Sequence, residues 1–114
     1  MLFRSRILKN PIDRAAYLLK TLGIDADAPE HTSFAPEFLM QQMEWRETLM
    51  DAQMAQNNEA LRALDQEISR EQDKLYQDLR TAFAGNDHEA AAQWVRHGRF
   101  LNKMRNEIAA ALQD

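Results

Sequence analysis

Residues 82–90 read AFAGNDHEA and separate two long segments that carry helical patterns. Gly85 is a residue type that ends helices, and either Asn86 or Asp87 can cap the helix that follows. Because this connection is so short, the flanking helices must fold back on each other as an antiparallel hairpin. The stretch therefore predicts an all-α bundle.

Apolar residues on both sides of this turn recur at steps of three and four. The segment before it carries a seam with coiled-coil-like spacing: Leu61, Leu64, Ile68, Leu75 and Leu79. The segment after it carries a second stripe: Trp94, Leu101, Met104, Ile108 and Leu112. These two stripes are the predicted contact between the hairpin helices.

A short helix is predicted near the N-terminus. Asn10 can cap free backbone amides, and Pro11 suits the first helical turn. Apolar spacing continues to about Thr21, and Gly23 is suited to the left-handed conformation that ends helices. Residues 24–33 should form a loop.

A second helix is predicted from near Pro36, behind Ser33 as a plausible cap, to about Met54. Asn57-Asn58 weakens helical propensity, and the pattern leaves open whether the chain breaks or bends there. The expected architecture is a three-helix bundle with an antiparallel coiled-coil-like hairpin, plus the short N-terminal helix.

The helix at 36–54 carries two apolar stripes about 120° apart around its axis. The first contains no acid and is the better core candidate: Phe38, Trp45, Leu49 and Ala52. The second is a candidate docking surface: Leu39, Met43, Met50 and Met54. Three acids border or interrupt it: Glu44, Glu47 and Asp51. The alternative is a helix wedged between two neighbours that bury both stripes, since methionine commonly fills gaps in cores.

Phe100 lies outside the apolar stripe of the last helix and is flanked by Arg96, Arg99 and Lys103. Two interpretations remain open. Phe100 either packs against the 36–54 helix or stands exposed as a binding anchor. Gly98 costs helical stability and suggests a close approach of another backbone.

The totals exclude several classes of function. With 114 residues, the chain is long enough for one domain. A net charge of −4 argues against general nucleic-acid binding. No apolar run approaches the roughly 20 residues that span a bilayer. The absence of cysteine suits a reducing compartment. We expect a cytoplasmic protein with a protein partner and no membrane association.

Catalytic and metal-binding signatures are missing from the sequence. The histidines His31, His88 and His97 stand too far apart for helical metal-ligand spacing, and no cysteine assists them. Glu44 and Glu47 have a spacing that is commonplace on exposed helices. We expect no metal, no cofactor, no catalytic residue and no enzymatic activity.

Several segments together resemble a known family over about residues 8 to 114. They are Asn10-Pro11, the run from Arg14 to Leu19, Gly23, residues 38–47, and Arg99-Phe100-Leu101 followed by Lys103. Their order and spacing resemble the carboxy-terminal domain of HscB, the J-type co-chaperone of iron-sulfur cluster assembly.

The resemblance implies a partner and a set of contacts. Members of that family bind the scaffold IscU through this helical domain. The implied apolar contacts are Leu39, Met40, Met43 and Phe100, and the implied charged contacts are Glu44, Glu47 and Asp51. The expected function is to hold the scaffold for delivery to the Hsp70 HscA. The alternative is self-association into a homo-oligomer without scaffold binding.

The family's J domain carries a His-Pro-Asp tripeptide that stimulates the ATPase of HscA. This tripeptide does not occur here, so the J domain is expected to be absent from this chain. Residues 1–7 show little pattern, and we expect an artificial or truncated start there.

Overall fold

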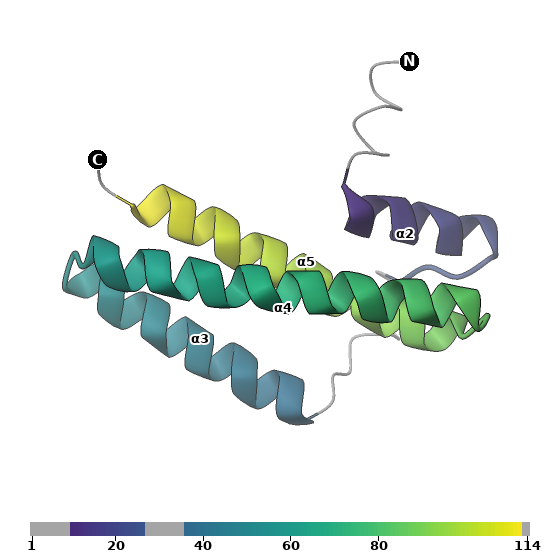
Figure 1. Cartoon of the computed structure of the whole chain (residues 1–114), viewed down its shortest axis with the longest axis horizontal. Coiled ribbons are helices and arrows are strands. Elements are labelled where there is room, and N and C mark those ends of the chain that lie inside the picture. The colour runs from purple at the N-terminus through teal and green to yellow at the C-terminus, as the bar shows by residue number, and fades with distance from the viewer. Residues whose placement is uncertain (1–9, 27–35, 113–114) are drawn as a thin grey trace, which may run out of the picture.

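The computed structural model describes residues 10–26 and 36–112, which contain four helices (Figure 1). These are α2 (Pro11–Thr21), α3 (Pro36–Met54), α4 (Asn58–Ala84) and α5 (His88–Ala111). Helices α3, α4 and α5 form a bundle, and α2 packs on α5. The predicted all-α fold class is confirmed. The expectations for residues 1–7, for Ser33 as a cap and for the loop after residue 26 lie outside the described residues.

Local capping sets both ends of α2. The backbone N–H of Ile12 donates to Asn10 Oδ1 at 2.9 Å, and Pro11 needs no such partner. At the other end, Gly23 has φ of +84°, while the N–H of Ile24 donates back to the Leu19 carbonyl at 2.8 Å. The predicted bounds of this helix are confirmed.

The chain breaks between α3 and α4 instead of bending. Gln56 adopts a φ of +50°, and the N–H of Asn57 donates to the Ala52 carbonyl at 2.9 Å. The Asn57 side chain then caps α4 by accepting from the N–H of Ala60 at 3.1 Å. A single asparagine therefore follows the end of one helix and begins the next.

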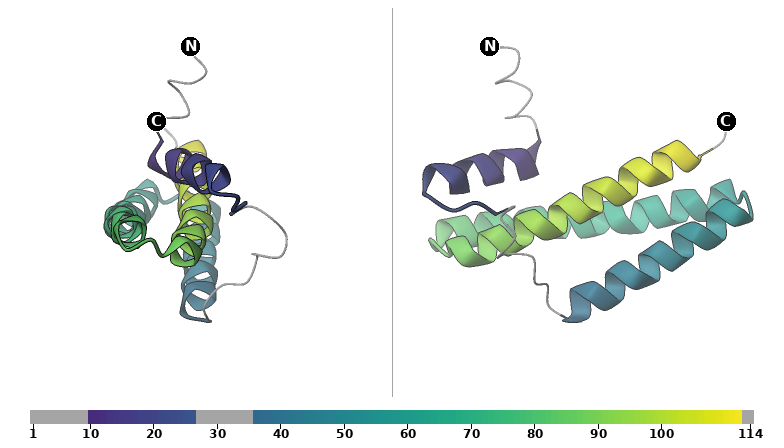
Figure 2. Two further views of the ribbon diagram at one scale, coloured as in Figure 1. Left: turned by 90° about the vertical axis from the view of Figure 1, so that its right-hand side faces the viewer. Right: turned by 180° about the vertical axis from the view of Figure 1, so that it is seen from behind.

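The predicted hairpin turn joins α4 to α5, and the two helices run antiparallel (Figure 2). Asp87 caps α5 by accepting from the N–H of Ala90 at 3.2 Å. Asn86, not Gly85, takes the left-handed conformation, with φ of +57°. Asparagine tolerates that region better than most residues. The turn therefore joins the helices as the sequence indicated, but its left-handed residue is Asn86, one position after Gly85.

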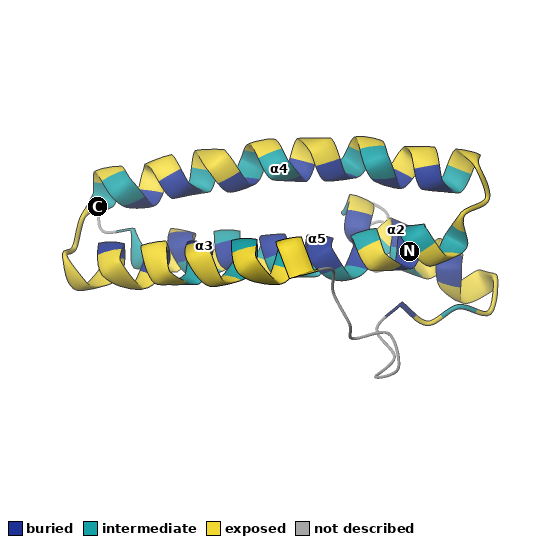
Figure 3. Ribbon diagram, turned by 90° about the horizontal axis from the view of Figure 1, so that it is seen from below, coloured by how far each residue is buried: buried dark blue, intermediate teal, exposed yellow. Residues whose placement is uncertain are grey.

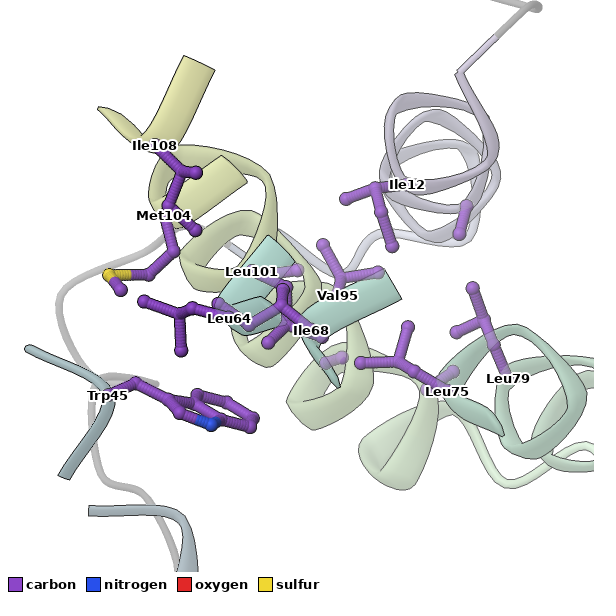
Figure 4. Packing of buried hydrophobic residues seen from close by; sticks show 14 of the residues in the cluster. Ile12, Trp45, Leu64, Ile68, Leu75, Leu79, Val95, Leu101, Met104 and Ile108 are labelled. Carbon is purple, nitrogen blue, oxygen red and sulfur yellow. The ribbon is translucent and has the colours of Figure 1, made fainter. Parts of the chain in front are cut away.

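Helix α5 contacts all three other helices, which widens its buried face. On α4 the predicted seam is buried throughout, and Figure 4 shows part of it meeting α5. On α5 the prediction was partly wrong, because Trp94 and Leu112 are only partly buried. Its buried residues are Ala91, Ala92, Val95, His97, Gly98, Leu101, Met104 and Ile108.

A polar link interrupts the apolar seam between α4 and α5. Gln72 is buried and donates through Nε2 to Asn102 Oδ1 at 2.6 Å. Its Oε1 accepts from Arg105, whose guanidinium also forms two hydrogen bonds to Asp65, at 2.9 and 3.1 Å. A satisfied polar group at a seam position fixes the register of two helices.

Gly98 is the point where α2 approaches α5. A Cβ atom added there would meet the Ile12 side chain, with Cγ1 only 2.9 Å away. An ion pair between Arg99 and Asp13, at 2.9 Å, adds to this contact. The close approach that Gly98 suggested is confirmed, although a side chain of α2 rather than its backbone fills the space.

Candidate functional site

Helix α3 has a buried side that packs on the bundle. Trp45, Leu49 and Ala52 are buried, and Trp45 points toward Leu64 of α4 (Figure 4). The indole Nε1 donates to Glu67 Oε2 at 3.0 Å, so the ring's polar atom is satisfied. This side is the stripe that the sequence assigned to the core.

Phe38 completes the buried stripe at the start of α3, where it is half-buried. Its ring stacks on the imidazole of His97 with centroids 4.2 Å apart, and it also meets Trp94 at 5.5 Å. The aromatic contact joins the first turn of α3 to the middle of α5.

The opposite side of α3 is exposed along its whole length. Successive residues turn by about 100°, which places these side chains away from Trp45 and Leu49. The large apolar residues are Leu39 at 46%, Met40 at 66%, Met43 at 71%, Met50 at 59% and Met54 at 83% exposure. We call this set the methionine face. The remaining exposed large apolar residues of the described ranges belong to α2 and its C-cap residue. Within the described residues, the alternative in which neighbours bury both stripes is therefore wrong.

Three acids follow one edge of the methionine face, and we call Glu44, Glu47 and Asp51 the acidic edge. All three are exposed, as Figure 3 shows for much of the outer side of α3. Their carboxylates form no ion pair with any residue of the described ranges. They are consequently available to a basic partner.

Arg46 occupies the other edge of the methionine face, toward α5. Its guanidinium donates to both carboxylate oxygens of Glu107, at 3.2 and 2.9 Å. Its Cζ atom also lies 5.8 Å from the centroid of the Phe100 ring. The sequence-based predictions did not include this residue, although it lies about 20° from Leu39 on the helical wheel, on the side toward Leu49.

Phe100 lies at the α5 edge of the site and is half-buried. Its ring stacks on Trp45 with centroids 6.3 Å apart, so the interpretation that it packs against α3 is confirmed. The structure thus places six predicted contact residues together on exposed α3 positions and sets Phe100 beside them on α5, partly covered.

His97 lies beneath this region and is almost fully buried, with 4% exposure. Its Nδ1 has no hydrogen-bond partner among the described residues. Burial lowers the pKa of His97, because the charged imidazolium would lose its hydration there. As expected, this histidine has a packing role: its ring lies against Phe38 where α3 meets α5.

The described residues contain no cluster of three or more histidines or acids placed to hold a metal ion. They also contain no helix that is both long and apolar enough to cross a membrane. Two cavities lie away from the methionine face. One of 480 Å³ lies between α2 and α4, beside Leu18 and Phe83, and one of 450 Å³ surrounds Gln72 and Arg105.

Comparison with known proteins gives consistent matches. The family model described as the HSCB C-terminal oligomerisation domain matches residues 34–109. A co-chaperone protein HscB homolog of Neisseria meningitidis serogroup B is 68% identical over 107 residues, covering 94% of this chain and 64% of the relative. A co-chaperone protein HscB homolog of Burkholderia multivorans is 40% identical over 108 residues, covering 95% of this chain and 62% of the relative.

A solved structure of chaperone HscB from Vibrio cholerae superposes with a TM-score of 0.75 at 34% identity. The match covers 92% of this chain and 61% of that one. The chain therefore spans less than two thirds of the length of these relatives, which are named as chaperones or co-chaperones rather than enzymes. Sequence, family model and fold agree, and the chain belongs to the HscB co-chaperone family.

Proposed function

We propose that this bundle is the scaffold-binding part of an iron-sulfur co-chaperone, which holds an IscU-type scaffold protein through the methionine face and the acidic edge of α3. The observation that supports this most directly is the exposure of Leu39, Met40 and Met43 on a helix whose opposite side is already buried. A folded monomer gains nothing from large apolar groups in water, so such a cluster marks an interaction surface.

The arrangement has the features of a protein interface. A few large apolar side chains supply most of the binding energy once water is excluded, and charges at the rim set register and encounter rate. Met40 and Met43 are flexible and polarizable, so they adapt to a partner's shape. The acidic edge calls for basic groups on the scaffold.

The proposed mechanism is delivery of a bound protein, with no bond made or broken by this chain. The resemblance to HscB implies that a J domain in the full-length protein presents the scaffold to an HscA-type Hsp70. In that arrangement α3 provides the binding surface, and the α4–α5 hairpin supports α3 rigidly.

Self-association is the second candidate, favoured by the family model's description as an oligomerisation domain. The charge pattern opposes one form of it. In an antiparallel two-fold dimer built on the methionine face, the acidic edge of each copy would lie against that of the other. Like charges brought together weaken such a contact. A second copy in this antiparallel arrangement is therefore a poorer occupant than a basic scaffold.

The test is calorimetric titration of the chain into a purified IscU-type scaffold. A Leu39→Ala/Met40→Ala variant removes two exposed anchors, and a Leu18→Ala/Leu22→Ala variant removes two exposed leucines at α2. Figures 1 and 2 show that α2 and α3 lie on opposite sides of the α4–α5 pair, so the second variant is a matched control.

We expect saturable binding by the parent and by the α2 control. The α3 variant should lose about 2 kcal/mol or more of binding free energy. Circular dichroism should show unchanged helicity in all three. Phe100→Ala is tested separately, because its contact with Trp45 makes a loss of stability expected as well. Absence of binding by the folded parent would contradict the proposal and leave self-association as the better account.

A further inference from the structure

Four of the side chains on the methionine face are thioethers in open contact with water. They are Met40, Met43, Met50 and Met54, with exposed fractions of 66%, 71%, 59% and 83%. Met104, in contrast, is fully buried between the helices of the bundle. The chain has no cysteine, so no thiol in it competes for an oxidant.

We propose that these four methionines are a modification site, at which a peroxide oxidises the thioethers to sulfoxides and so weakens docking of the partner protein. The inference rests on the proposed function, because it concerns regulation of the same surface.

The chemistry is complete with hydrogen peroxide as the oxidant. The methionine sulfur attacks one peroxide oxygen with an electron pair, so that an S–O bond forms as the O–O bond breaks. The leaving hydroxide then takes the proton from the oxygen newly bonded to sulfur, and the products are one sulfoxide and one water. Sulfur is oxidised by two electrons and the peroxide is reduced by two. Because hydrogen peroxide carries no charge, the acidic edge does not repel it.

Each sulfoxide replaces an apolar atom with a strong hydrogen-bond acceptor. An acceptor buried in an interface without a donor opposes binding. The acidic edge beside these methionines cannot supply that donor, because ionised carboxylates only accept hydrogen bonds. Met40 and Met43 lie among the predicted scaffold contacts. Met50 and Met54 continue the same face along the helix and make it sensitive over its whole length.

The first experiment needs no partner. The full chain is treated with hydrogen peroxide, the reaction is stopped with catalase, and sulfoxide at each methionine is quantified by peptide mass spectrometry. We expect Met40, Met43, Met50 and Met54 to oxidise at least ten times faster than Met104, while circular dichroism shows the helices intact. Equal rates at Met104, or loss of helicity as the four sites react, would overturn the assignment of a selective site.

The second experiment measures binding of the oxidised chain to an IscU-type scaffold, which is added only after the peroxide has been removed so that its own residues stay unmodified. We expect the dissociation constant to rise at least tenfold. Treatment with methionine sulfoxide reductases should restore it, since the sulfoxide is reversible.

The matched control carries Met40→Leu, Met43→Leu, Met50→Leu and Met54→Leu, which keeps the face apolar without an oxidisable sulfur. Whatever affinity this variant has before treatment, peroxide should leave that affinity unchanged, because no oxidisable sulfur remains on the face. An oxidised parent that binds as tightly as the untreated one would overturn the regulatory inference and leave the proposed function standing. No binding by the untreated parent would overturn both, although the oxidation rates would still show whether the site is selective.

Discussion

Gly98 is the residue at which the packing of α2 is decided. Its missing side chain leaves room for Ile12, and a Cβ atom there would also lie 3.4 Å from Leu75 Cδ2. Gly98→Ala gains up to about 1 kcal/mol of helix propensity but overpacks this contact, which costs about 1 to 3 kcal/mol. We expect a net destabilisation of up to about 2 kcal/mol in urea unfolding.

The coupling between the two residues provides the check. Ile12→Val removes the methyl group nearest the new Cβ, so the double variant should lose less stability than the two single losses added together. If the two losses of unfolding free energy simply add, the cost of Gly98→Ala does not come from contact with the Ile12 side chain.

His97 gives the bundle a pH dependence whose sign follows from burial. Its pKa in the folded state lies below the ordinary value of 6.5, so the unfolded chain takes up a proton more readily. Stability should be fully present above pH 6.5 and should fall as the pH drops from there toward the lowered pKa. Urea unfolding at several pH values, with His97→Phe as the non-titrating comparison, isolates the effect. A variant that loses stability over this window as steeply as the parent would contradict the assignment.

Helix α3 is held by fewer buried side chains than its neighbours. Its buried residues are three, Trp45, Leu49 and Ala52, whereas α4 buries seven and α5 buries eight. A helix with little buried area opens locally at low cost. We expect amide hydrogen exchange in α3 to be at least tenfold faster than in the central turns of α4 and α5. Equal protection across the three helices would show that the bundle opens only as a unit.

At the level of the helices, some features could be predicted from the sequence and others could not. The starts of α2 and α5 were predictable because Asn10 and Asp87 cap them locally. The two sides of α3 were predictable because acids occur on only one of them. The buried face of α5 was not, since Val95 and Gly98 are buried only because α5 meets three helices at once. The spacing of apolar residues shows which face of a helix is apolar, but it does not show how many other helices pack against that helix.

At the scale of the candidate site, the α3 residues that the sequence grouped together do share one exposed face, whereas Phe100 is partly covered. The spacing of the α3 residues fixes a shared face without any knowledge of the fold. Phe100 belongs to another helix, and whether it is open or covered depends on how α5 packs on Trp45. Its partial burial could not be derived from its own segment.

The whole molecule carries a net charge of −4, and the charges of the acidic edge lie beside its only large exposed apolar face on the bundle helices of the described ranges. This gives the two candidate functions opposite responses to salt. A basic scaffold is attracted to the acidic edge, so screening should weaken its binding. An antiparallel dimer sets two acidic edges together, so screening should strengthen self-association.

The measurement follows both equilibria between about 0.01 M and about 0.1 M salt, where the Debye length falls from about 30 Å to about 10 Å. We expect the scaffold's association rate to fall over this range, with little change in its dissociation rate, because rim charges mainly steer encounter. Glu44→Gln/Glu47→Gln should flatten the dependence while leaving the apolar anchors in place. Sedimentation of the chain alone supplies the comparison: a dimer that forms more readily at the higher salt, with scaffold binding indifferent to it, would assign the methionine face to a second copy of this chain.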